Sequence, residues 1–448
     1  MLQKHSVRIL ALSLATLISM TARADDSFGQ WLDGGHVSGD LRLYDFGRDY
    51  AGTASNTPTG SPYTGKNIFN FKDMNAVSLG GKIKWESADL DGFSAAAALY
   101  FAYDIGMNNY TYNPNKLYAA NYNYPYLNPL LMGVNRTVDT LGEAYIQYKN
   151  PWLISKVGNQ TIDNPWVNSS DGFMIPNLYQ AVTATVTPIT GLQFEGDRVL
   201  RYKNRTVTDF QEYNLSALPY DKIVYNGTNS GTADIGASYK DDRYLAQAWL
   251  YHFYGFANMT YLEGGYKLPG ADFVPFANVQ YVHETGNGDI GTVNAAVYGA
   301  KLGIDLPRGW GNVYIAYNRA ANNNVQSSTG IVSDGNLFSP YTQIYNTDPL
   351  YTTVMNYGLV SARAAGYAWL VGATLHPLGP TLDITPTVSN YYTAPYVATS
   401  RAYMLDIAYH LNGAFKGLTI RDRLGIEHDI PLLGSAYVDN RVMLQYTF

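Results

Sequence analysis

Arginines stand between apolar residues in several short stretches near both ends of the sequence. Arg42 lies in "DLRLYDF", Arg421 and Arg423 lie in "TIRDRLG", and Arg441 begins "RVMLQYTF". Alternation of this kind predicts β-strands with one polar and one apolar face. Where the polar face lines a water-filled channel, a row of fixed positive charges attracts anions and selects solutes by charge.

Other basic residues extend this pattern. Lys82 and Lys84 alternate in "GGKIKWE", and we expect them to lengthen the positive wall formed by the four arginines. Arg198, Arg201 and Lys203 predict a second basic cluster on the far side of the fold. The wall arginines could instead form ion pairs that stiffen it; the candidate acidic partners are Asp40, Glu427 and Asp439. The sequence leaves both interpretations open.

Motifs of enzyme or metal chemistry are absent from the sequence. It has no cysteine and no G-x-S-x-G or H-E-x-x-H motif. Glu427, His428 and Asp429 are adjacent in "IEHD", but neighbouring residues rarely converge on one ion, and the other histidines are scattered. The sequence therefore predicts no enzyme, no metal site and no cofactor.

Period-two alternation recurs along the whole chain, whereas long helical patterns are scarce. The stretch "AYMLDIAYHL", for example, places Tyr403, Leu405 and Ile407 opposite Asp406 and His410. Such segments predict strands with one apolar face.

The predicted strands are joined alternately by short and long connections. Eight short ones, such as "SADLDG" at 87–92 and "KDDR" at 240–243, alternate with nine longer ones, such as 47–75 and 105–139. An even number of strands, with short turns at one end and long loops at the other, is typical of outer-membrane barrels. We therefore expect an all-β fold, an 18-stranded antiparallel transmembrane β-barrel with both termini at the short-turn end.

The last predicted strand ends on an aromatic residue and must close the barrel. Its apolar face, which we expect to meet lipid, consists of Val442, Leu444, Tyr446 and Phe448. Lipid penalises unpaired strand edges, so this strand should pair with the first one, "HVSGDLRLYDF" at 36–46. An aromatic end after alternating apolar residues also resembles the signal that the barrel-assembly machinery reads.

A signal peptide is expected over residues 1–24 and the barrel over 25–448. Lys4 and Arg8 precede the apolar run "ILALSLATLISM", and "ARA" provides small residues before a cleavage site after Ala24. The mature chain would carry 27 basic and 36 acidic residues, a formal charge of −9, which makes nucleic acid a poor partner. Its 40 tyrosines suit an aromatic belt at the membrane interface. The predicted location is the bacterial outer membrane.

The stretch 142–182 resembles the OprD family of substrate-specific porins. In that family a strand ends in Gly-x-Gln, and Asp-x-Pro and then Asp-x-x-Met-x-Pro follow it. The matching residues in this sequence are Gly158, Gln160, Asp163, Pro165, Asp171, Met174 and Pro176. Phe173 stands where the family usually has an arginine, so we expect the loop to be held differently here.

The resemblance implies that the 161–180 loop folds into the lumen and forms a constriction. It also implies that acidic loop residues, here Asp163 and Asp171, face a ladder of basic residues that guides a substrate carboxylate. The positions to which we carry that ladder are Arg42, Arg421, Arg423 and Arg441.

The connection at 321–365 is too long for a plain connector. It carries four tyrosines, namely Tyr341, Tyr345, Tyr351 and Tyr357. Either it folds inward and narrows the pore, or it is an exposed surface loop.

Together these patterns predict a porin that passes small hydrophilic solutes passively and selectively, with carboxylate-bearing nutrients or amino acids as the first candidates. The alternatives are a general non-selective porin and a surface adhesin displayed on a barrel anchor. The expected partners are small-molecule solutes, outer-membrane lipid and lipopolysaccharide, and the barrel-assembly machinery during biogenesis. A homotrimer is one assembly that the sequence leaves open.

Overall fold

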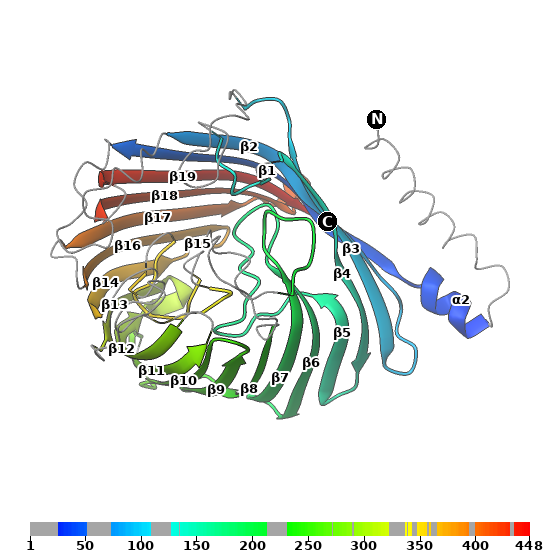
Figure 1. Ribbon diagram of the computed structural model, residues 1–448, viewed down its shortest axis with the longest axis horizontal. Coiled ribbons are helices and arrows are strands. Elements are labelled where there is room, and N and C mark those ends of the chain that lie inside the picture. The colour runs from blue at the N-terminus through cyan, green and yellow to red at the C-terminus, as the bar shows by residue number, and fades with distance from the viewer. Residues whose placement is uncertain are drawn as a thin grey trace.

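The computed structural model shows one closed sheet of 18 strands (Figure 1). It describes residues 26–51, 73–108, 127–133, 135–212, 231–270, 272–288, 291–321, 337, 339–342, 347–355, 358–359, 365–393, 399–430 and 434–448. The signal peptide expected over 1–24 lies outside these residues.

The elements follow each other as a series of hairpins. A short helix, α2 (Asp26–Asp33), precedes the sheet, and one four-residue strand, β15 (Pro377–Pro380), lies outside it. The barrel strands are β1 (His36–Ala51), β2 (Met74–Glu86), β3 (Phe93–Asp104), β4 (Thr137–Lys149), β5 (Leu153–Gln160), β6 (Leu178–Ile189), β7 (Leu192–Lys203), β8 (Thr232–Lys240), β9 (Tyr244–Phe253), β10 (Ala257–Lys267), β11 (Val274–Gly288), β12 (Gly291–Asp305), β13 (Gly311–Ala320), β14 (Gly366–Leu375), β16 (Leu382–Thr393), β17 (Ser400–His410), β18 (Leu418–Ile430) and β19 (Gly434–Thr447).

Every neighbouring pair of strands is antiparallel, and the first strand pairs with the last. In this closing pair Leu41 lies opposite Tyr446 and Leu43 lies opposite Leu444. The predicted 18-stranded antiparallel barrel and its closure are confirmed.

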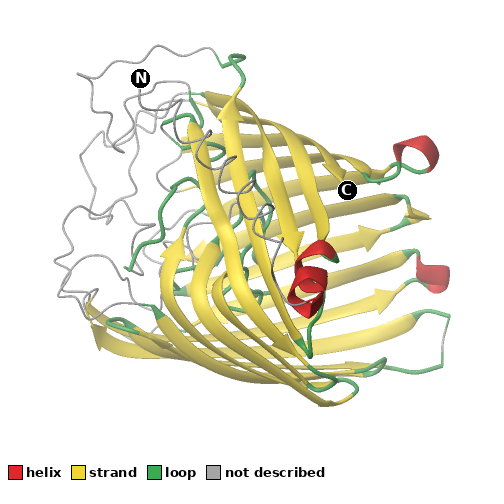
Figure 2. Ribbon diagram, turned by 90° about the vertical axis from the view of Figure 1, so that its right-hand side faces the viewer, coloured by secondary structure: helices red, strands yellow, loops and turns green. Residues whose placement is uncertain are grey.

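Short turns connect the strands at one end of the barrel, the end where the chain terminates (Figure 2). All eight predicted short connections are present, for example 87–92 between β2 and β3 and 241–243 between β8 and β9. Among the nine connections expected at the other end, the two short members expected near 284–294 and 428–437 are shorter still. The strands continue through these regions, and Gly288 pairs with Gly291.

The outer face of the barrel is apolar, as expected for contact with lipid. Leu43 and Leu444 are 40% and 39% exposed although they pair in the middle of two strands. Side chains of this size are normally buried in a water-soluble protein, whereas lipid solvates them. Among the described residues, no helix is both long and apolar enough to cross a bilayer.

Two polar pairs interrupt this apolar face close to the barrel seam. Asn440 donates a hydrogen bond to the carboxylate of Asp422 at 2.9 Å. Asn75 donates to the carboxylate of Asp45 at 2.8 Å. Pairing across strands lowers the cost of placing these polar groups on the outer wall, because each carboxylate keeps a hydrogen-bond donor.

Loops fill much of the barrel interior. Side chains of the 161–177 segment, such as Trp166 and Met174, are fully buried against inward-facing strand residues. Tyr341 and Leu359 of the 321–365 connection are buried in the same interior. The inward-folded loops are therefore confirmed for the described residues, while Tyr345 and Tyr357 lie outside them.

A charge placed on the outer face tests this sidedness. Replacing Leu444 with Arg should lower the free energy of unfolding by about 2–4 kcal/mol, because lipid does not solvate a guanidinium. The matched control is Gln445→Arg, one position along on the lumen side, which should cost far less. Denaturant titration of the barrel folded into lipid vesicles measures both; equal costs would contradict the assignment of faces.

Candidate functional site

The base of the 161–177 loop is fixed by the residues that match the porin motif. Gln160 donates a hydrogen bond to the carbonyl of Ala181 at 3.0 Å and accepts one from Thr183 at 3.0 Å. The carboxylate of Asp163 accepts from the backbone N–H of Ser169 at 3.2 Å. The loop therefore leaves β5, turns within a few residues and returns into the barrel.

Asn164, beside Pro165 in the turn, binds this base to the inner face of β7, β8 and β9. Its side-chain amide donates to Asp197 on β7 and to Asp234 on β8, both at 3.1 Å. Its carbonyl oxygen accepts from Tyr251 on β9 at 3.1 Å. Three neighbouring strands thus hold one loop residue.

The tip of the loop crosses the interior and binds β1 through Arg42. Two parallel hydrogen bonds, of 2.6 and 2.7 Å, join the Arg42 guanidinium to the Asp171 carboxylate. The same guanidinium donates to the carbonyl of Phe173 at 2.6 Å, and Tyr44 donates to the carbonyl of Gly172 at 3.0 Å. We call the Arg42–Asp171 pair the clamp.

The two partners of the clamp differ in their access to water. The Arg42 side chain is 5% exposed and is also ion-paired with Asp40 at 2.6 Å, whereas Asp171 is 43% exposed. Partial desolvation by the surrounding protein raises the pKa of Asp171, but the hydrogen bonds and charge of Arg42, with the charges of Lys82 and Arg205, lower that pKa below its usual range. Asp171 is therefore ionised at neutral pH, which keeps the clamp closed.

Phe173 stands where the family that the 142–182 stretch resembles usually has an arginine, and two arginines hold its ring. The guanidinium carbon of Arg205 lies 4.3 Å from the centre of the Phe173 ring, and that of Arg441 lies 4.8 Å from it. Phe46 packs against the same ring at 5.8 Å. Cation–π contacts contribute about 0.5–1 kcal/mol at exposed sites and about 2 kcal/mol when they are desolvated. The aromatic residue therefore fastens the loop without adding a charge to it.

Met174 and Pro176 complete the return of the loop. Both are buried, and Met174 packs against Gly80 on β2. A Cβ atom at Gly80 would lie 2.6 Å from the terminal carbon of Met174. The absence of a side chain at Gly80 thus leaves room for the loop against the wall.

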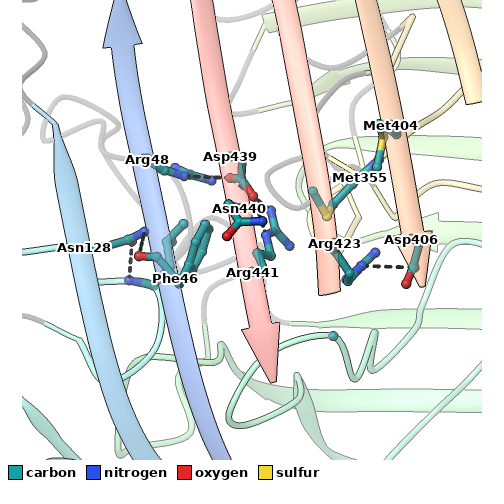
Figure 3. Close-up of polar contacts among 12 residues, drawn as sticks. Phe46, Arg48, Asn128, Met355, Met404, Asp406, Arg423, Asp439, Asn440 and Arg441 are labelled. Atoms are coloured by element: carbon teal, nitrogen blue, oxygen red, sulfur yellow. Dashed lines mark hydrogen bonds and ion pairs between the residues drawn. The ribbon is translucent and has the colours of Figure 1, made fainter. Parts of the chain in front are cut away.

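The positive wall exists, but acidic residues neutralise much of it. Arg441 and Arg48 share Asp439, at 2.6 and 3.0 Å (Figure 3). Ion pairing with Asp40 and Asp439 is thus confirmed as predicted.

Arg421 and Arg423 share a different acid, Asp406 on β17. Their nitrogen atoms lie 2.6 and 3.2 Å from the same carboxylate oxygen. Arg421 remains 32% exposed and Arg423 18%, whereas Arg441 is fully buried. Of the four predicted ladder arginines, only these two have more than a small part of the side chain accessible.

Of the two acidic loop residues expected to face the ladder, Asp171 does so by direct contact. Its carboxylate binds the wall directly through Arg42. Asp163 stays exposed on the loop, and it makes no ion pair within the described part of the chain. The loop therefore adds its negative charge to the basic wall itself.

The predicted second basic cluster does not form in the lumen. Arg198 pairs in register with the outward-facing Val182 and lies over the ring of Tyr254 at 4.5 Å. Arg201 is exposed and ion-paired with Glu212 at 2.8 Å. Arg198 continues the outward alternation of Phe194, and a β-bulge between Val199 and Arg201 places Arg201 on the outer face as well.

The two inward lysines of β2 differ from each other. Lys84 is ion-paired with Glu86 at 3.2 Å and with Glu143 at 3.4 Å. Lys82 lies over the ring of Tyr100 at 5.7 Å.

The second inward loop packs against the opposite wall. Tyr351 donates to the Glu263 carboxylate at 2.7 Å, and Tyr341 lies 2.9 Å from the hydroxyl of Thr232. Asn168 of the first loop donates to the carbonyl of Thr347 at 3.0 Å, which joins the two loops. Together they narrow the barrel from the side away from the positive wall.

Three residues of this site escaped the sequence analysis in different ways. Arg48 continues the inward alternation of Arg42 and could have been found by extending the first strand. Asp406 stood on a predicted polar face, but nothing local paired it with Arg421. Arg205 follows the end of β7 with no periodic signal, and only the folded loop brings it to Phe173.

Comparison with known proteins gives structures but no sequence relatives: no family model matches the chain, and no curated protein matches it. The structure of Pseudomonas aeruginosa OccK9 (OpdG) is 15% identical, with 93% of this chain and 99% of that chain covered at a TM-score of 0.71. This structure and the other matching structures are porins of the OprD family. The chain has the fold of an OprD-family porin.

Two other structures agree with this result. P. aeruginosa OpdK with vanillate is 14% identical and covers 93% of this chain and 99% of its own, with a TM-score of 0.68. Acinetobacter baumannii OccAB3 is 16% identical and covers 93% and 100%, with a TM-score of 0.66. The resemblance seen in the 142–182 stretch is thus confirmed for the fold, and the fold agrees with the predicted outer-membrane location.

Removing the acid of the clamp should release the loop tip. Asp171→Asn loses a charge-assisted pair that contributes about 1.5–3 kcal/mol, so single-channel conductance in planar bilayers should rise and become noisier. Asp163→Asn is the matched control, because it changes the same loop but keeps an acceptor for Ser169. If the two variants conduct alike, the clamp does not hold the constriction.

Proposed function

We propose that this protein is an outer-membrane porin that passes small hydrophilic solutes passively and prefers those that carry a carboxylate. The observation that carries the proposal is the clamped loop beside two accessible arginines. The 161–177 loop is held at its base and at its tip. Arg421 and Arg423 face the lumen and share one carboxylate, that of Asp406. This leaves one net positive charge on that part of the wall.

The loops favour a selective porin over a general one. A general porin needs a wide lumen, whereas here two loops fold inward and are joined to each other through Asn168 and Thr347. Selection then depends on the few groups that border the remaining passage. The OpdK structure with vanillate, which is a carboxylate, supports this class of solute as the first to test.

An adhesin would use the barrel only as an anchor. It would not need arginines bound to a loop deep inside the barrel, and the buried clamp therefore favours transport. The proposal involves no covalent chemistry.

Paired solutes provide the test. Vesicles that contain the protein should swell faster in a small carboxylate than in the neutral amide of the same size. The double variant Arg421→Gln with Arg423→Gln should reduce this preference, because Asp406 then remains without its two cations. Equal swelling in the wild type would indicate a general porin. The absence of any channel in planar bilayers would support the adhesin instead.

A further inference from the structure

We propose that three lysines, Lys82, Lys156 and Lys301, are the cations that a solute anion contacts directly, ahead of the arginines of the wall. The inference rests on the proposed function and names the residues that determine its specificity. Two of the three, Lys156 on β5 and Lys301 on β12, lie outside the positive wall predicted from the sequence.

The wall arginines already have partners. Arg42 contacts two carboxylates, those of Asp40 and Asp171. Arg421 and Arg423 share a third, Asp406. A solute carboxylate at Arg42 would exchange one ion pair for another, and at Arg421 and Arg423 it would compete with Asp406. The net gain in binding free energy is therefore smaller than at a cation that forms no ion pair.

The three lysines have no such partner. Within the described part of the chain, no carboxylate forms an ion pair with Lys82, Lys156 or Lys301. All three are half-buried and their positions in the strands place them on the inner face. Their ammonium donors are therefore available to a solute.

Aromatic rings hold each of these ammonium groups in place. Lys156 lies 4.9 Å from the centre of the Tyr145 ring. Lys301 lies 3.9 Å from that of Tyr314, and Lys82 lies 5.7 Å from that of Tyr100. A ring face stabilises a cation without accepting all of its hydrogen bonds, which leaves N–H groups for an anion.

Lys84, on the same strand as Lys82, is a lysine whose charge is neutralised by ion pairs. It contacts Glu86, Glu143 and the hydroxyl of Tyr145, the last at 2.9 Å. Tyr145 thus lies between a lysine that is ion-paired with two acids and Lys156, which forms no ion pair with any residue that the structure describes. The difference between neighbours indicates that the acids are placed selectively.

The lysines lie on different sides of the lumen. Lys82 neighbours the clamp, since it pairs in register with Asp40 on β1. Lys301 belongs to β12, which stands across the barrel from β2 (Figure 1). A carboxylate that passes the constriction would meet positive charge on both sides, so these positions suit transient contacts along a path.

Solute block of single channels tests the proposal. Lys82→Gln, Lys156→Gln and Lys301→Gln should each weaken block by a small carboxylate about fivefold, the factor for one contact between unit charges in water. The measurement uses 0.1 M KCl, in which the screening length of about 10 Å leaves a direct contact nearly unscreened, and the two controls below separate contact from a change of net charge. The corresponding Lys→Arg variants should keep wild-type block.

Two controls separate direct contact from other effects. Lys240→Gln removes an exposed lysine at the end of β8, beside a short turn, and should leave block unchanged. Arg421→Gln also removes one positive charge from the lumen. It should weaken block less than any lysine variant, because Arg423 remains ion-paired with Asp406 and no unpaired carboxylate is left to repel the solute.

The outcomes distinguish this inference from the proposed function. Channels whose block survives all three lysine substitutions, or is lost only in the arginine variants, would overturn the inference while the porin stands. A single lysine variant with wild-type block removes that lysine from the set. If the wild-type protein forms no channel, the porin proposal itself fails.

Discussion

A lipid bilayer offers no water to unpaired backbone groups, and the whole architecture depends on this constraint. Each strand must be hydrogen-bonded on both sides, so the first and last strands must meet. They do so through 12 register pairs, from Asp40 with Thr447 to Ala51 with Ala436. Because alternation carries across every pair, closure fixes at once which side chains meet lipid and which meet the lumen.

The interior then has to accommodate the charges that lipid excludes. Arginines that project inward need acidic partners, and some of these come from loops that fold into the barrel. Asp171 both neutralises Arg42 and fixes the loop tip on β1. Phe173 adds contacts to two further guanidinium groups without changing the charge. The same interactions thus stabilise the wall and define the passage.

Local alternation was sufficient to predict the barrel and its closing pair, because two-residue periodicity is a property of each strand alone. It also placed Arg42 and Arg421 on the inner face correctly. It failed for Arg201, because a bulge after Val199 changes the register where nothing in the sequence marks it. The clamp partner of Arg42 is 129 residues away, and only the folded loop brings the two together.

The chain has no cysteine, so single introduced cysteines report on sidedness without interference. Arg421 and Ile420 are neighbours on β18 that point to opposite faces. A charged, water-soluble thiol reagent should change the current through single channels of Arg421→Cys and leave Ile420→Cys unaffected. Reaction at Ile420→Cys with no effect at Arg421→Cys would contradict the assignment of inner and outer faces, and with it the proposed transport path.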